Sequence, residues 1–516
     1  MKFKHDRLAF SLIALLLAGA VSCAKKPTGT CCPPMPGATG TTTAGIPERP
    51  EKLSFPALTY ESPAPEKFRV QLKSGPVAYV VPDRELPLVN FSILVRTGDY
   101  LDPDGKEGLA NLTGYLLARG GIKSKSAEEL EERLAFLAAQ LNASIADSQG
   151  GVSLNLLSKD LDEGLAILRE VLTTPRFQED KLTLRKKQMI QFMKQRNDES
   201  SAIEGREANR LAYGENFFNN RYSTAASVET ITRADLEAFH QKWFVPANFI
   251  VAVNGDFDRA DMIARLEKLF ADWPFQGETP PPVPSNPTFA EAGVYLVDKD
   301  VNQGRVSIML PGIKRDNPDY FPIIIMNDIL GGGGFTSRIM NRVRSDEGLA
   351  YSVNSRFEGG AYYADPWRLV YQTKVRSTPY ATQIALEEIR KIRDTPVTQE
   401  ELDTAMNSFI VGFPSRFGTA NAIAGALAAE EMTGRYARDP GWFGEYAGRI
   451  GAVTLADVQR VAQRLLDPAK MTFLFVGNAK EMSMGDGKHD VTLVKLAGGE
   501  PKALALRDPA TMKPLP

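Results

Sequence analysis

The hydrophobic and polar positions follow two different periods along the chain, and each period predicts a different kind of element. Residues 88–95 (LVNFSILV) and 304–310 (GRVSIML) are short, rich in β-branched residues and typical of strands. Residues 126–141 (SAEELEERLAFLAAQL) and 232–244 (TRADLEAFHQKWF) begin with a Ser or Thr cap and carry an apolar stripe, which predicts two helices. Strands and helices mix without a strict strand–helix–strand alternation, so the predicted fold class is α+β.

The same succession of elements occurs twice. The segment KWFVPANFIVAVNGDFD aligns with RLLDPAKMTFLFVGNAK, which pairs Pro246 with Pro468 and Gly255 with Gly477 at one common offset. A second pair of segments, EGLAILREVLTTPRFQEDKL and TQIALEEIRKIRDTPVTQEEL, aligns at an offset one residue shorter. These matches predict a tandem duplication of a domain of about 220 residues, each copy a mostly antiparallel sheet packed with helices.

Segments rich in proline, glycine and threonine separate the two copies from the rest of the chain. They predict a leader at 1–23, a flexible tether at 24–64, a first domain at 65–275, a proline-rich linker at 276–287, a second domain at 288–497 and a tail at 498–516.

The N-terminal residues predict export. Basic residues precede an apolar run at 8–20 that is too short to span a bilayer and suits a signal peptide. The run ends at AVSC, which fits either a simple cleavage site or a lipobox that leaves Cys23 lipidated, although Ala20 stands where a lipobox usually has leucine. We favour the lipobox, which anchors the protein by lipid to the periplasmic face of a bacterial membrane, the outer membrane in preference.

Composition excludes several classes of function. The net charge is −2, and no stretch concentrates basic and aromatic residues, which argues against nucleic-acid binding. All three cysteines lie in or beside the leader, so the folded body has neither a disulfide nor a thiol nucleophile. The chain has three histidines; we expect His240 to be a partly exposed helix residue and His489 to lie in a polar loop.

Several motifs together carry a family resemblance. EGLANLTGYLLARGG, LNASIADSQGG, VPANFIVAVNGDFD and SRIMNRVRSDEGLAYSV resemble the pitrilysin/insulinase metallopeptidases, and most of all the two-domain branch that includes mitochondrial processing peptidase. The resemblance covers residues 65–497 and implies that the two domains form one half of a clamshell.

The resemblance also shows what is missing. The family binds Zn²⁺ through H-x-x-E-H on a helix and a further Glu about 75 residues on, and the Glu within the motif is the general base. Here the helix in residues 108–121 has Asn111 and Tyr115 at the two His positions and Gly114 at the Glu position, and Gln191 stands at the expected third position. We therefore expect no metal or other cofactor in this chain.

The second copy retains other features that the resemblance associates with function. In relatives, an Arg and a Tyr seven residues apart donate hydrogen bonds to the substrate carbonyl, and Arg344 and Tyr351 have that spacing. Ordinary structural roles for the pair would be an ion pair of Arg344 with a nearby acid and a half-buried Tyr351.

Two further segments match parts of the family that contact substrate. They are an edge strand with Asn142 and Ala143 at its centre, which would take a peptide as an added strand, and a glycine loop of Gly331, Gly332, Gly333 and Gly334. A plain turn before a helix explains the glycines equally well.

These features predict a subunit that cannot hydrolyse peptides alone. The expected function is to supply Arg344, Tyr351 and peptide-binding surface to a zinc-bearing homologous partner, with zinc only in that partner and a peptide as substrate. The alternative is a structural or peptide-binding scaffold of the same fold with no part in catalysis. A homodimer also remains open.

Overall fold

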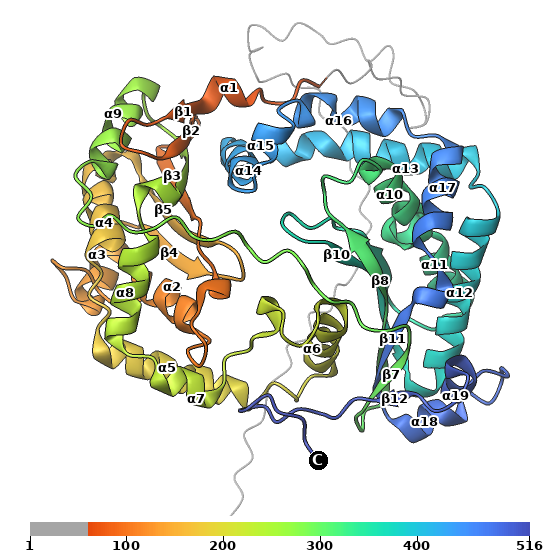
Figure 1. Ribbon diagram of the computed structural model, residues 1–516. Coiled ribbons are helices and arrows are strands. Elements are labelled where there is room, and N and C mark those ends of the chain that lie inside the picture. The colour runs from red at the N-terminus through yellow and green to blue at the C-terminus, as the bar shows by residue number, and fades with distance from the viewer. Residues whose placement is uncertain (1–59) are drawn as a thin grey trace, which may run out of the picture. The chain divides into compact units, whose positions relative to one another are not determined.

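The strands and helices of residues 60–516 are described by a computed structural model (Figure 1). The leader, Cys23 and nearly all of the expected tether lie outside the described residues, so lipidation stays a prediction. Within residues 60–516, no helix is both long enough and apolar enough to cross a membrane.

Two mixed sheets of six strands form the centre of the fold, with the strand orders β1-β2-β6-β3-β5-β4 and β12-β7-β11-β8-β10-β9. The strands of the first are β1 (Arg69–Gln71), β2 (Val77–Pro82), β3 (Leu88–Val95), β4 (Gln140–Ile145), β5 (Gly150–Leu157) and β6 (Phe249–Gly255). Those of the second are β7 (Gly293–Asp298), β8 (Gln303–Ile313), β9 (Val353–Arg356), β10 (Asp365–Lys374), β11 (Thr472–Gly477) and β12 (Lys502–Ala503).

The two sheets repeat one topology. β2 and β7 pair in parallel with β6 and β11, whereas the next three pairings in each sheet are antiparallel. The strands that contain the aligned Gly255 and Gly477, β6 and β11, occupy equivalent central places. The duplicated, mostly antiparallel α+β architecture expected from the sequence is confirmed.

Helices flank both sheets. Those of the first half are α1 (Pro65–Phe68), α2 (Leu109–Arg119), α3 (Ala127–Phe136), α4 (Leu161–Thr173), α5 (Glu179–Met193), α6 (Ser200–Tyr213), α7 (Ala225–Thr230), α8 (Arg233–Trp243) and α9 (Arg259–Phe270). Those of the second half are α10 (Tyr320–Asn327), α11 (Arg338–Met340), α12 (Thr378–Asp394), α13 (Gln399–Gly412), α14 (Ala420–Met432), α15 (Arg435–Arg438), α16 (Trp442–Gly451), α17 (Leu455–Leu465), α18 (Ala479–Met484) and α19 (Leu493–Ala497).

The caps read from the sequence are present, but one helix is shorter than expected. Ser126 and Thr232 each form a capping box at the start of α3 and α8. α3 ends at Phe136 instead of continuing to residue 141, because Ala138 adopts a left-handed conformation with φ 49° and β4 begins at Gln140. The apolar stripe continues past the turn, so periodicity alone could not locate the end.

The two halves exchange helices. α6, from the first half, packs on the second sheet, where Ile203 and Ala208 meet Val297, Met309 and Leu474. α14, the equivalent helix of the second half, packs against β2, β6 and β3 of the first sheet. Each sheet therefore has its own half's helices on one face and a helix of the other half on the opposite face.

A glutamate on α6 binds the second sheet. Glu204 is almost fully buried and accepts hydrogen bonds from Ser307 and Arg368 of the second half. The guanidinium of Arg305 lies 3.7 Å from the same carboxylate. The exchanged helix is therefore held by charge as well as by its apolar face.

A glutamate on α14 makes the reciprocal contact with the first sheet. Glu431 accepts two hydrogen bonds of 3.0 Å from Arg69 in β1 and one of 2.9 Å from the Tyr79 hydroxyl in β2. Both exchanged helices are thus joined to the sheet of the other half by a carboxylate that accepts from an arginine and a hydroxyl.

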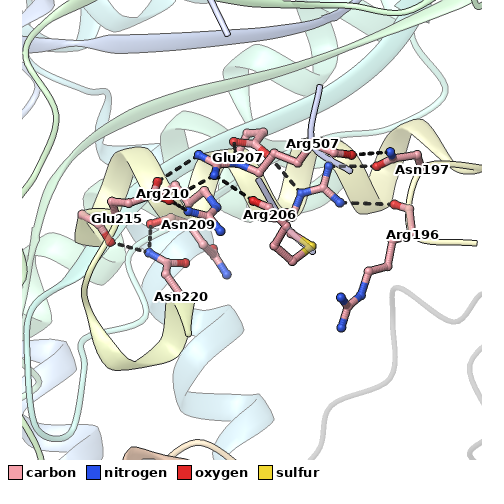
Figure 2. A network of polar contacts seen from close by, with 11 residues as sticks. Arg196, Asn197, Arg206, Glu207, Asn209, Arg210, Glu215, Asn220 and Arg507 are labelled. Carbon is pink, nitrogen blue, oxygen red and sulfur yellow. Dashed lines mark hydrogen bonds and ion pairs between the residues drawn. The ribbon is translucent and has the colours of Figure 1, made fainter. Parts of the chain in front are cut away.

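The segment expected to be a tail is part of the fold. β12 extends the second sheet, and beyond it Arg507 forms a two-pronged ion pair with Glu215, at 3.0 and 2.9 Å (Figure 2). The Asn197 amide donates to the Arg507 carbonyl at 2.7 Å, so the C-terminal segment is tied to the chain on either side of α6.

Candidate functional site

The helix at the degenerate zinc motif lies unusually close to a strand. Asp102 caps α2, because its carboxylate accepts hydrogen bonds of 2.8 Å from the Gly108 and Ala110 backbone N–H groups. At Gly114, a Cβ atom would lie 2.5 Å from the Ile145 nitrogen and 2.8 Å from the Ser144 carbonyl carbon in β4. No side chain fits there unless the backbone moves, so the position that the resemblance assigns to the general base cannot hold a glutamate.

Replacement of Gly114 by alanine tests this close packing. Alanine in place of a helical glycine normally stabilises a helix by about 1 kcal/mol. At Gly114 the collision with β4 should reverse the sign and lower the free energy of unfolding by about 1–2 kcal/mol. The matched control is Gly448→Ala in α16. No described atom lies within 4 Å of a Cβ placed there, so this substitution should raise the free energy of unfolding. Equal gains from both variants in chemical denaturation would contradict the close packing.

The second His position is occupied by an aromatic ring that contacts two cations. The guanidinium carbons of Arg119 and Arg185 lie 4.8 and 4.1 Å from the centre of the Tyr115 ring. Asn111, at the first His position, is exposed. An amide, a missing side chain and a phenol beside two positive charges do not fit Zn²⁺, which prefers imidazole, thiolate and carboxylate ligands.

A pocket of about 640 Å³ opens beside Tyr115. Its wall is formed by α2, α3, β4 and α5, and from α5 it receives Lys181, Arg185 and Gln188. Gln191, which the sequence count placed at the third ligand position, is exposed and does not line this pocket. Gln188, one helical turn before Gln191, lines the pocket instead.

The described histidines offer no replacement metal site. His240 is buried, which corrects the expectation of partial exposure: its Nε2 donates to the Leu172 carbonyl at 3.0 Å, and burial lowers its pKa to about 4. His489 stacks on Tyr380 and bonds Asp486 through Nδ1 at 2.8 Å. Within residues 60–516, no three His, Cys, Asp or Glu side chains form a group able to hold a metal ion.

The segment with Asn142 and Ala143 is an edge strand, as the resemblance implied. β4 is the last strand of the first sheet and pairs only with β5 among the described strands. Asn142 is exposed and lines the pocket beside Tyr115, whereas Ala143 is buried against the core. The open side of β4 leaves backbone groups available to an added strand.

Arg344 and Tyr351 lie together and neither has the ordinary structural role. The Tyr351 side chain is 83% exposed, and its ring centre lies 4.5 Å from the Arg344 guanidinium carbon. Phe335, which the sequence analysis did not identify, is 64% exposed and lies at the same distance of 4.5 Å. Within residues 60–516, Arg344 forms no ion pair. Stacking occupies guanidinium faces and leaves in-plane N–H donors free.

The glycine segment positions this cluster. Gly331 is buried against β9, where a Cβ would lie 2.6 Å from the Ser355 hydroxyl oxygen. Gly334 has φ +61°, which favours glycine, and it leads directly into Phe335. Gly331 and Gly332 end a widened helical turn at Asp328–Gly332, and a 3-10 turn at Gly334–Thr336 then presents Phe335. Arg344 itself lies in a widened helical turn at Asn341–Asp346, where the backbone hydrogen bonds span five residues.

The two groups of candidate residues lie apart in the chain's architecture. All residues that line the pocket beside Tyr115 come from the first half, and Arg344 and Tyr351 belong to the second half and do not line it. The pair can therefore act on a peptide only outside that pocket.

Buried carboxyl groups lie just before α2. Burial, together with the charges of Asp147 and Asp102, raises the pKa of Asp99 to about 7, while Arg221 opposes the shift. Burial likewise raises the pKa of Asp102 to about 6, against the two backbone hydrogen bonds that it accepts. One oxygen of Asp99, Oδ1, is buried and has no hydrogen-bond partner among residues 60–516.

These shifts predict a pH-dependent stability. Between about pH 4 and pH 7, Asp99 is protonated in the folded chain and ionised in the unfolded chain. The free energy of unfolding therefore falls as pH rises through this range. Asp99→Asn removes the titration and should raise stability at pH 8 by about 1–2 kcal/mol while changing little at pH 4. Thermal unfolding of both proteins across this range provides the measurement; a constant difference at all pH values would contradict the shift.

The sequence and the fold both match known proteins. Residues 80–222 match the family model for insulinase (peptidase family M16), and residues 230–409 match that for the peptidase M16 inactive domain. The non-peptidase homolog YmxG of Helicobacter pylori is 27% identical over 347 residues, which are 65% of this chain and 77% of the relative. An uncharacterized zinc protease of Rickettsia bellii is 24% identical over 355 residues, 64% of this chain and 82% of the relative.

A solved structure has the same fold. The peptidase M16 inactive domain protein from Pseudomonas fluorescens superposes with a TM-score of 0.70 at 24% sequence identity, over 80% of this chain and 97% of that one.

Proposed function

Because this chain belongs to the peptidase M16 family as a member of the inactive type, we propose that it is the zinc-less subunit of a two-chain peptidase. One observation carries the proposal: Arg344 and Tyr351 are adjacent, accessible and free of ion pairs within residues 60–516. A structural arginine is normally paired with an acid or a carbonyl group, whereas Arg344 contacts two exposed aromatic rings.

The proposed chemistry divides between two chains. The zinc-bearing partner supplies the activated water at an intact H-x-x-E-H site. This subunit contributes the Tyr351 hydroxyl and the Arg344 guanidinium, which donate hydrogen bonds to the peptide carbonyl oxygen as negative charge develops on it. Phe335 and Tyr351 both contact the guanidinium, so less conformational freedom is lost when its N–H groups meet the oxyanion.

Reconstitution tests this proposal. The full chain, a zinc-bearing homologue that co-purifies with it, and their mixture are assayed on one fluorogenic peptide. We expect cleavage from the mixture alone, and its loss when a chelator removes zinc. If the homologue cleaves the peptide equally fast alone, this chain has no catalytic part.

The scaffold alternative rests on a different observation. The free edge of β4 passes a polar pocket in the first half, which suits peptide binding without catalysis. Peptide binding by this chain combined with no effect on the homologue's turnover would favour it.

A further inference from the structure

The pocket beside Tyr115 has the opposite charge to a site that binds a metal cation. Three cations line it, Arg119, Arg185 and Lys181, against one carboxylate, Glu131, which is exposed. Within residues 60–516, Lys181 is paired with Glu128 at 2.5 Å, and neither arginine has an ion pair. Two guanidinium groups therefore remain available to an anion.

Arg185 contacts Tyr115 and has one buried donor without a partner among residues 60–516. Its guanidinium carbon lies 4.1 Å from the Tyr115 ring centre, and the unpartnered donor is its Nε. A buried donor left without a partner destabilises the folded chain, so a ligand that accepts from this group recovers part of that loss. A carboxylate suits it best, because its two oxygens match the N–H fork of an arginine.

The pocket lies where an added strand would run. Gln140, Leu141 and Asn142 belong both to the open edge of β4 and to the pocket wall. A peptide paired with β4 would therefore pass the pocket mouth, and a side chain directed toward α2 and α5 would reach the two arginines.

We infer that the pocket beside Tyr115 is a receptor for a carboxylate carried by an extended peptide on β4. The inference rests on the proposed function, since it names the class of peptide that the zinc-less subunit holds. The carboxylate comes from an Asp or Glu side chain or from the C-terminus of the peptide, and the experiment separates these sources.

Binding of three labelled peptides to the full chain, measured by fluorescence anisotropy, provides the test. All have the same extended core. The first has a central Glu and an amidated C-terminus, the second is the neutral peptide with a central Gln and an amidated C-terminus, and the third has a central Gln and a free C-terminus. We expect a carboxylate-bearing peptide to bind about tenfold more tightly than the neutral one, with the advantage shrinking at high salt. The better of the two acidic peptides identifies the source.

Two pocket variants and one control complete the design. Arg185→Gln and the more exposed Arg119→Gln should each bring the acidic peptide close to the affinity of the neutral one and leave the neutral one unchanged. Arg133→Gln, which removes a cation on α3 that pairs with Glu163, should change neither. Equal binding of all three peptides, or binding of none of them, overturns the inference. The proposed function is tested separately, by the reconstitution with the zinc-bearing homologue.

Discussion

Replacing Tyr351 by phenylalanine in the two-chain enzyme is expected to lower kcat by about 10²–10³-fold with little change in KM. The loss of one donor to an oxyanion typically has an effect of this size, because the hydrogen bond forms mainly in the transition state. Since the Tyr351 side chain is 83% exposed and no described residue bonds its hydroxyl, the fold and the subunit contact should survive. Steady-state kinetics of the co-purified complex provides the measurement.

Two further variants make this result specific. Arg344→Ala should lower kcat similarly and weaken peptide binding as well, since it removes a charge. Tyr436→Phe removes a hydroxyl from another surface of the second half, where it bonds Glu66 at 3.3 Å, and should leave kcat unchanged. Wild-type rates from Tyr351→Phe and Arg344→Ala in an intact complex would make these side chains structural and favour the scaffold.

Replacing Glu204 by glutamine is expected to lower the free energy of unfolding by about 3 kcal/mol. The change removes the buried negative charge on α6 and leaves the positive charges of Arg305 and Arg368 unpaired. Removing one partner of a buried ion pair is strongly destabilising because the remaining charge is poorly solvated. The expected loss is at the low end for such pairs, because both arginines are about a quarter exposed. Urea denaturation gives the change in midpoint.

The matched control for Glu204 is Glu358→Gln. Glu358 pairs with Arg356 at 3.1 Å beside the same sheet, but both side chains are more than half exposed. Exposed pairs contribute about 0–1 kcal/mol, so the midpoint should barely move. Similar midpoint shifts in the two variants would mean that the contribution of Glu204 to stability does not depend on its burial.

The sequence predicted those structural features that depend on interactions between residues close together in the chain. The strand at residues 88–95 has the bounds of β3, and the caps at Ser126 and Thr232 begin α3 and α8, because strand alternation and capping depend on near neighbours. The duplicated sheet was predicted differently, from proline and glycine positions that recur at one common offset between the two halves.

What the sequence could not predict depends on contacts between distant residues. His240 is buried because aromatic rings of other segments, including Phe177 and Phe275, surround it. Arg185 reaches Tyr115 from another helix, and Phe335 reaches Arg344 from a preceding turn. None of these pairs has a fixed spacing within one element, so no periodicity marks them.

The exchange of α6 and α14 has a consequence for how such a chain arises. Neither half can cover both faces of its sheet with its own helices, so a single copy standing alone would expose the apolar surface that the other half's helix now buries. Two identical copies that lend each other this helix would form a symmetric, domain-swapped dimer. The present chain has the arrangement of that dimer, with the two copies joined in one chain by the proline-rich segment.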